Sequence, residues 1–312
     1  GTYFPANFTK ENAFAMINQY DSTKGVGDFS SSVSTPSRIL SFFGRLNYNL
    51  MERYLLTVTF RADGSSKFAP SNRWGYFPSV AAGWRISEEA FIKDNVEWLS
   101  NLKIRGSWGQ IGNDKIGNDK YYALANVAPT YDAVFGGDYY SGGTVTSLYN
   151  TQIHWERSEQ LDLGFDLGLF KNRIILGIDY FNKITDNLIT SKVLPNTSGY
   201  GSILTNLGKV RFRGFDAEIT TRNIVKKDFT WESKFTITYV KNKVLKLPEN
   251  GRDKNRQGGY SVKMQDGTTK EFGGVAEGEP LGRFYGYKKD FIITTPEQAA
   301  NARYDTSSKG FI

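Results

Sequence analysis

The sequence contains no cysteine and a single histidine, His154, among its 312 residues. The absence of cysteine excludes disulfide frameworks, thiolate metal sites and cysteine nucleophiles. One histidine cannot build a histidine-based metal centre, so we interpret His154 as an ordinary loop residue. No stretch approaches the roughly 20 consecutive apolar residues that a membrane-spanning helix needs. This criterion does not detect the strands of a membrane β-barrel, because polar residues that face the lumen alternate with the apolar ones.

Clusters of basic residues are also missing, although the net charge is +7. A nucleic-acid binder concentrates lysine and arginine in runs with interleaved aromatics, whereas here the charges are scattered. The nucleophile elbow, the phosphate-binding loop and the zinc-protease motif do not occur either. Asp162, Asp166 and Asp179 could suggest a glycosidase. They recur along one polar strand face instead of converging on a site, so we predict neither an enzyme nor a nucleic-acid partner.

What the chain does contain is a repeated alternation of apolar and polar side chains, the pattern of strands. In the first such segment Leu46, Tyr48 and Leu50 alternate with Asn47 and Asn49. Ten residues at about 3.3 Å each, tilted near 40°, rise about 25 Å, the height of the apolar band of an outer-membrane barrel. Eight segments follow this pattern: 40–50, 54–63, 74–86, 102–109, 161–169, 174–181, 215–220 and 231–239.

The connections between these segments alternate in length. Short connections are expected at 51–53, 171–173 and 223–228, and a medium one at 87–99 with a short helix begun by Glu88 and Glu89. Long connections are expected at 64–73, 112–158 and 185–208, and after residue 243. Short periplasmic turns and long external loops are typical of outer-membrane barrels. The fold class predicted is all-β: part of a transmembrane, antiparallel up-and-down β-barrel with long extracellular loops.

The two faces of the predicted strands differ in chemistry. Ionised groups in a dry core would cost several kcal/mol each unless paired, whereas they cost little in a water-filled lumen. The charged residues predicted to face the lumen are Arg45, Arg61, Arg85, Arg105, Asp162, Asp166 and Glu218. Aromatic rings suit the headgroup zone of a bilayer. The membrane-interface aromatics predicted are Tyr48, Tyr54, Trp74, Tyr76, Trp84, Trp108, Tyr180 and Tyr239.

Several collinear blocks resemble the SusC/RagA family of TonB-dependent outer-membrane transporters. They begin with RYLLTVTFRADGSSKFAPSNRWGYFPSVAAGWRISEEAF at 53–91 and NLKIRGSWGQIGN at 101–113, and continue with WERSEQLDLGFDLGLFKNRI, DYFNKITDNLI, GKVRFRGFDAEIT and EGEPLGRFYGY. The resemblance implies a barrel of about 22 strands with a plugged lumen. It also implies TonB-dependent import of glycan fragments or peptides and a SusD-like lipoprotein partner.

On this resemblance we interpret the chain as an internal barrel fragment of a larger bacterial outer-membrane protein. Residues 1–37 are then an extracellular loop leading into the barrel, 38–243 about eight strands, and 244–312 a long extracellular loop region. The plug, through which TonB acts, and the final strands lie outside it, and the apolar faces meet outer-membrane lipid. Two alternatives remain open: a structural barrel or adhesin without transport, and a soluble β-rich carbohydrate-binding protein or hydrolase.

Candidate contacts for cargo or for the lipoprotein lie in or beside the long connections. They are Asp63, Ser65, Ser66, Tyr139, Tyr140, Trp155 and Tyr200. Aromatic rings stack on sugars or peptide side chains, and Asp63–Ser66 also has the composition of a simple turn. The direct repeat IGNDK at 111–120 offers oxygen ligands but not the spacing of a calcium loop, so we expect a flexible loop. No cofactor or metal site is predicted.

Overall fold

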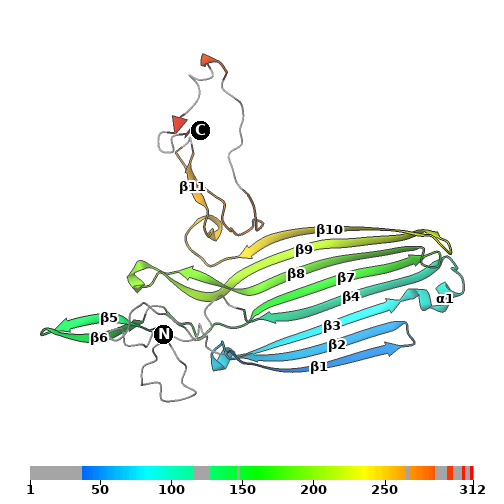
Figure 1. Cartoon of the computed structure of the whole chain (residues 1–312), viewed down its shortest axis with the longest axis horizontal. Coiled ribbons are helices and arrows are strands. Elements are labelled where there is room, and N and C mark those ends of the chain that lie inside the picture. The colour runs from blue at the N-terminus through cyan, green and yellow to red at the C-terminus, as the bar shows by residue number, and fades with distance from the viewer. Residues whose placement is uncertain are drawn as a thin grey trace, which may run out of the picture.

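The computed structural model describes residues 37–115, 127–145, 148–264, 267–284 and 294–297, and the short strands at 304–305 and 310–311. Eight strands form one curved antiparallel sheet in the order β1-β2-β3-β4-β7-β8-β9-β10 (Figure 1). Their bounds are β1 Ile39–Leu50, β2 Tyr54–Ser65, β3 Trp74–Arg85, β4 Leu99–Asn113, β7 Glu156–Leu169, β8 Ile174–Val193, β9 Ser202–Val225 and β10 Thr230–Lys246.

All eight predicted strands are present, and each hydrogen-bonds to the next in chain order. The fold is therefore an antiparallel up-and-down arrangement, as predicted. The order is interrupted once, where a separate hairpin of β5 (Val127–Phe135) and β6 (Asp138–Val145) lies between β4 and β7. In Figure 1 this hairpin projects beyond the end of the sheet.

The two ends of the sheet differ in their connections, and we call them the turn end and the loop end. The turn end carries the connections 51–53, 86–98, 170–173 and 226–229. In the first of them Arg53 donates its backbone N–H to the carbonyl oxygen of Leu50, and both Met51 and Glu52 have positive φ. That mirror-image turn matches the twist of the paired strands, which explains the tight reversal.

The connection 86–98 contains η4 (Ile86–Glu88) and the short helix α1 (Ala90–Lys93). A short helix was predicted here, and Glu89 lies at its N-cap position.

At the loop end two predicted loop boundaries are wrong. Residues 185–208 do not form one long loop: β8 and β9 stay paired up to Val193 and Ser202, with register irregularities near Leu188. Within 112–158, β4 runs to Asn113 and β7 begins at Glu156. The alternating pattern is weak in these extensions although the backbone pairing continues, and the strands predicted from the pattern were therefore too short.

The segment after β10 contains η6 (Asp253–Asn255) and a hairpin of β11 (Tyr260–Lys263) and β12 (Thr269–Phe272). Two further short strands, β13 (Tyr304–Asp305) and β14 (Gly310–Phe311), pair with each other. Short 3-10 turns, η3 (Pro70–Asn72) and η5 (Asn196–Ser198), lie in the connections at the loop end. No helix in the described ranges is long and apolar enough to cross a membrane.

The strands expose their apolar side chains instead of burying them. Phe42 is 61% exposed, Leu46 64% and Phe235 63%. Within the described part of the chain, strand contacts join neighbours in the sheet, and no second layer covers either face. Buried apolar residues gather at the loop end, where Phe68, Phe77, Ile153 and Trp155 form the one cluster found among the described residues. We call this cluster the loop-end core.

Candidate functional site

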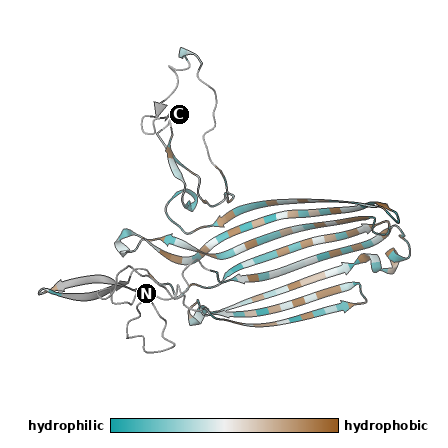
Figure 2. Ribbon diagram, in the orientation of Figure 1, coloured by the Kyte–Doolittle hydropathy of each residue, from teal (hydrophilic) through white to brown (hydrophobic). Residues whose placement is uncertain are grey.

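Apolar side chains cross the whole sheet on one face, which we call the apolar face. The strand register places two unbroken rows on it, each with one residue from every strand. One row is Leu50, Tyr54, Trp84, Ile104, Phe165, Ile178, Ala217 and Ile237. The adjacent row is Tyr48, Leu56, Ala82, Gly106, Leu163, Tyr180, Phe215 and Tyr239. Figure 2 shows the alternation along each strand as brown and teal segments.

Toward the loop end, the apolar side chains extend further along the strand in β1 than in β10. In β10 the apolar side chains stop at Tyr239, two residues beyond the first row, whereas in β1 they reach Leu40, ten residues beyond it. A rise of about 26 Å along the strands over about 34 Å across the sheet corresponds to a tilt of about 40°. A level apolar band therefore requires strands tilted as they are in membrane barrels.

The predicted interface aromatics all lie on the apolar face and follow the borders of this band. The border at the loop end carries Trp74, Tyr76, Trp108, Tyr180 and Tyr239, and the border at the turn end carries Tyr48, Tyr54 and Trp84. Several of their rings stack across strands: Phe42 on Trp74, Tyr54 on Trp84 and Phe215 on Tyr239, with centroids 5.7–6.3 Å apart. Trp231, which was not predicted, extends the border at the turn end on β10.

The opposite face, the polar face, carries ionised groups in paired arrangements. Arg105 donates through Nη2 to Asp179 Oδ2 at 2.7 Å and to Asp166 Oδ1 at 3.2 Å. Gly164 lies between Arg105 and Asp179 in the register, and a Cβ there would collide with the Asp179 carboxylate. The glycine therefore leaves room for a three-strand ion cluster, whose members remain about one-third exposed.

The other charged residues predicted for the lumen also share this face. Arg45 donates to the Thr59 hydroxyl at 3.2 Å, and Glu218 pairs with Lys234 at 2.8 Å. A groove on this face has both signs of charge in its lining: Lys103, Arg105, Asp166, Asp179, Asp216 and Glu218. The remaining predicted members also form ion pairs or hydrogen bonds: Arg61 with Asp63, Arg85 with Glu88, and Asp162 with Ser107.

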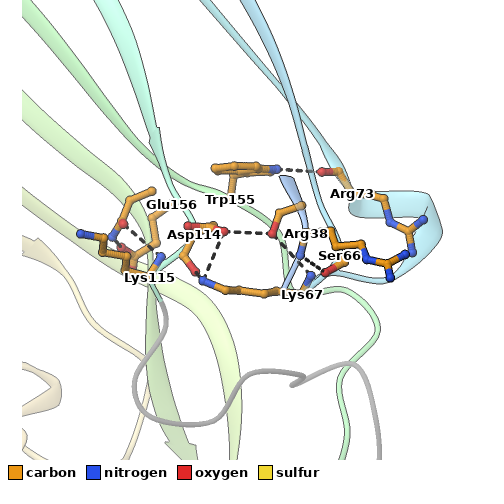
Figure 3. Close-up of polar contacts among 10 residues, drawn as sticks. Arg38, Ser66, Lys67, Arg73, Asp114, Lys115, Trp155 and Glu156 are labelled. Carbon is orange, nitrogen blue, oxygen red and sulfur yellow. Dashed lines mark hydrogen bonds and ion pairs between the residues drawn. The ribbon is translucent and has the colours of Figure 1, made fainter. Parts of the chain in front are cut away.

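The loop-end core ties two connections to the sheet, and Figure 3 shows the contact of its Trp155 with Arg73. Trp155 packs against Phe68 and Phe77 with ring centroids 5.5 Å apart in both pairs. Its indole N–H donates to the carbonyl oxygen of Arg73 at 2.9 Å. Gly112 lies under the Phe77 ring, which occupies the space that a Cβ would take. The connection after β2 and the segment before β7 are thereby fixed against β3 and the end of β4.

A buried polar cluster lies beside the core. Ser65, which is fully buried, donates its hydroxyl to Asp114 Oδ2 at 2.9 Å, and Lys67 Nζ lies 3.2 Å from the same oxygen. Ser66 accepts the backbone N–H of Arg38 at 2.9 Å. The first IGNDK copy thus consists of the end of β4 and the two residues after it, of which Asp114 is held by Ser65 and Lys67. The expectation of a flexible loop was wrong there, and the second copy lies outside the described residues.

Burial changes the interpretation of the predicted cargo contacts. Asp63, Ser65 and Trp155 are 6%, 0% and 8% exposed, so they hold the loop end together and offer no surface to a ligand. Ser66 and Tyr200 are half-buried and remain candidates. Tyr139 and Tyr140 lie in β6, but their side chains fall outside the described residues. Sequence reasoning missed the core because Phe68 and Ile153 stand at isolated positions in the connections, and Phe77 alternates with the apolar-face residues of its strand.

Sequence reasoning also missed the role of Glu89 at the turn end. Its carboxylate accepts the Tyr54 hydroxyl at 2.7 Å, the Trp84 indole N–H at 3.0 Å and Arg53 Nη1 at 3.1 Å. The hydrogen bonds from Tyr54 and then Trp84 lower the pKa of Glu89, against a smaller opposing effect of burial. The carboxylate therefore clamps the first turn to the connection after β3.

The architecture agrees with comparisons across known proteins. Residues 1–311 match the family described as TonB dependent receptor-like, beta-barrel. The chain belongs to this family. TonB-dependent receptor P3 of Formosa agariphila is 37% identical over 90% of the chain, and TonB-dependent receptor SusC of Bacteroides thetaiotaomicron is 37% identical over 83%. The chain spans 27% and 26% of their respective lengths, so it corresponds to part of such a receptor.

Solved structures give the same result for this TonB-dependent receptor chain. The RagAB peptide importer in its "open-open" state superposes with a TM-score of 0.63 at 25% identity, over 82% of this chain and 27% of that one. Its "closed-closed" state gives a TM-score of 0.62. The predicted resemblance to the SusC/RagA family and the predicted outer-membrane location are thereby confirmed.

Proposed function

We propose that this chain is part of the barrel wall of a TonB-dependent importer that takes up glycan fragments or peptides. The observation that carries the proposal is the pair of apolar rows that crosses all eight strands, backed by a face of paired charges. An apolar surface of this extent needs a cover, and no protein layer covers it in the described residues. Hydrocarbon outside and water inside suit the two faces.

In this proposal the polar face lines the lumen, and the loop end is the extracellular mouth. Paired charges leave the wall with mixed polarity and no strong field of one sign. Such a wall suits neutral or mixed cargo better than a polyanion. Cargo is bound and moved, and no bond is made or broken, so the proposal does not involve an enzyme.

The partners proposed are TonB, acting through a plug outside this chain, and a SusD-like lipoprotein at the extracellular mouth. The solved relative RagAB is described as a peptide transporter. Both the glycan and the peptide class therefore remain in the proposal, since the chain is similar to SusC as well.

The test is an uptake assay in cells that carry the complete gene. We expect fluorescent oligosaccharides or peptides to enter wild-type cells and not cells without TonB or without the adjacent lipoprotein. Uptake that persists without TonB would contradict energy-coupled import. A barrel that assembles normally but imports neither class would favour a structural or adhesive role.

A further inference from the structure

Four cations lie together on the apolar face, just beyond its border at the loop end. They are Arg211, Arg213, Lys241 and Lys243, which we call the basic patch. Arg213 is directly opposite Lys241, and Arg211 is directly opposite Lys243. Because the register of β9 and β10 is unbroken from 211 to 221, these residues share the face of Phe215 and Tyr239.

Like charges directly opposite each other on one sheet face repel, and a sheet normally avoids them. No ion pair with a carboxylate of the described residues is found for any member of the basic patch. Arg211 and Arg213 lie on an interior strand, and their register neighbours on β8 are Ile184 and Asn182, which carry no charge. The neighbouring strands therefore do not neutralise these two arginines.

On the polar face of the same two strands, the cations form ion pairs with carboxylates. There Lys234 pairs with Glu218 at 2.8 Å, and Arg222 with Glu232 at 3.4 Å. Further from the apolar band, Lys209 pairs with Asp186 at 2.9 Å. On the apolar face, the four cations without an ion pair among the described residues thus lie between the apolar rows and the Lys209–Asp186 pair.

We propose that the basic patch binds the phosphate of an anionic lipid in the outer leaflet of the surrounding membrane. The stacked rings of Phe215 and Tyr239 lie directly on its membrane side, where acyl chains would contact them. Guanidinium groups bind phosphate through two parallel hydrogen bonds, and lysine stems can lie along apolar surface while the ammonium reaches the headgroup. The inference rests on the proposed orientation, in which the loop end is extracellular.

The patch fits a lipid better than cargo or a lid, because it lies on the outside of the wall and not on the polar face. A single phosphate brought between the four cations would relieve both like-charge pairs. The lipid class expected is a phosphorylated glycolipid or phospholipid, recognised by its phosphate.

Native mass spectrometry of the complete transporter in mild detergent tests the assignment. The probes are monophosphorylated lipid A and the same lipid with its phosphate removed. We expect the wild type to retain the phosphorylated lipid and Arg213→Gln/Lys241→Gln to retain about 25-fold less, since each cation near an anionic lipid surface contributes about fivefold. The matched control is Lys226→Gln/Lys227→Gln, which removes the same charge from exposed positions of the same hairpin at the turn end. It should bind like the wild type.

Three outcomes would overturn the inference: equal retention of both probes by the wild type, unchanged retention by the Arg213/Lys241 variant, or complete displacement by millimolar inorganic phosphate. The last would indicate a site for a free anion. Cargo uptake distinguishes this failure from failure of the proposed function. A variant that loses lipid but imports cargo leaves import intact, whereas a wild type that binds lipid without importing cargo contradicts only import.

Discussion

Trp155 donates its indole N–H to the backbone carbonyl oxygen of Arg73, 2.9 Å away, although 82 residues separate them in the chain. The bond joins the segment before β7 to the connection before β3. Its ring also contacts Phe68 and Phe77, so one side chain joins two connections and β3 at the loop end. At this position the aromatic ring serves the loop end itself and not a ligand.

Replacing Trp155 with alanine should loosen the loop end without unfolding the sheet. Removing a buried tryptophan costs about 3–5 kcal/mol, and Trp155→Phe should cost less, mainly the lost hydrogen bond at about 1 kcal/mol. Hydrogen exchange should rise in 64–73 and 149–155 and stay unchanged in 174–181 and 231–239, which lie away from the loop-end core. Trp98→Ala is the control because its side chain is 54% exposed in a turn-end connection. Equal exchange in both variants would contradict the structural role of Trp155.

Gly112 tests how tightly the same core packs. A methyl group at Gly112 would overlap the Phe77 ring, which is buried and cannot swing into solvent. We expect Gly112→Ala to destabilise the loop end by about 1–3 kcal/mol, the usual cost of overpacking. Gly44→Ala is the control, since nothing lies within 4 Å of the Cβ it would add. Thermal unfolding of the complete protein compares the two, and an equal shift would argue against a filled site.

The parts of this structure that the sequence predicted are those governed by the bilayer. Alternation in segments such as 40–50 and 161–169 follows from a boundary between hydrocarbon and water, which acts on every second residue. The paired extensions of β8 and β9 lack that boundary, because they lie beyond the apolar band and pack partly against the loop-end core, and their strand ends were therefore misplaced. Arg211 and Arg213 could have been placed on the apolar face by continuing the period backwards from Phe215.

The loop-end core and the contacts of Glu89 could not be predicted from the alternating pattern. They depend on contacts between residues far apart in the chain, such as Ser65 with Asp114 or Tyr54 with Glu89. No local sequence pattern predicts such contacts, because each partner taken alone resembles a turn or surface residue. The resemblance to a family fixed the fold and the environment, but it did not indicate which loop residues are buried.

Glu89 predicts a pH dependence at the turn end. Its pKa in the folded protein is lowered, chiefly by the hydrogen bond from Tyr54. The unfolded chain therefore binds a proton at higher pH, near the ordinary glutamate value of about 4.3. The stabilising contribution is present above that value and is lost as the pH falls through the lower folded pKa.

Thermal unfolding of the wild type and of Glu89→Gln measures this effect between about pH 3 and pH 7. The gap between the two proteins should be largest near neutral pH and should shrink on acidification. Glu97→Gln removes an exposed carboxylate from the same connection and should leave the profile unchanged. A gap that stays constant with pH would mean that the Glu89 charge is irrelevant to the clamp.

The assignment of the two faces gives the sharpest stability test. Val58 lies midway between Tyr54 and Ala62 on the apolar face of β2, and Thr57, the residue before it, lies on the polar face beside Asn47. Val58→Arg should cost about 2–4 kcal/mol, the penalty for a cation at the centre of a bilayer, whereas Thr57→Arg should cost under about 1 kcal/mol because its guanidinium meets water. Equilibrium folding of the complete barrel into lipid vesicles measures both. Similar losses of unfolding free energy at the two positions would mean that both faces meet the same medium, which would contradict the interpretation of the sheet as a barrel wall.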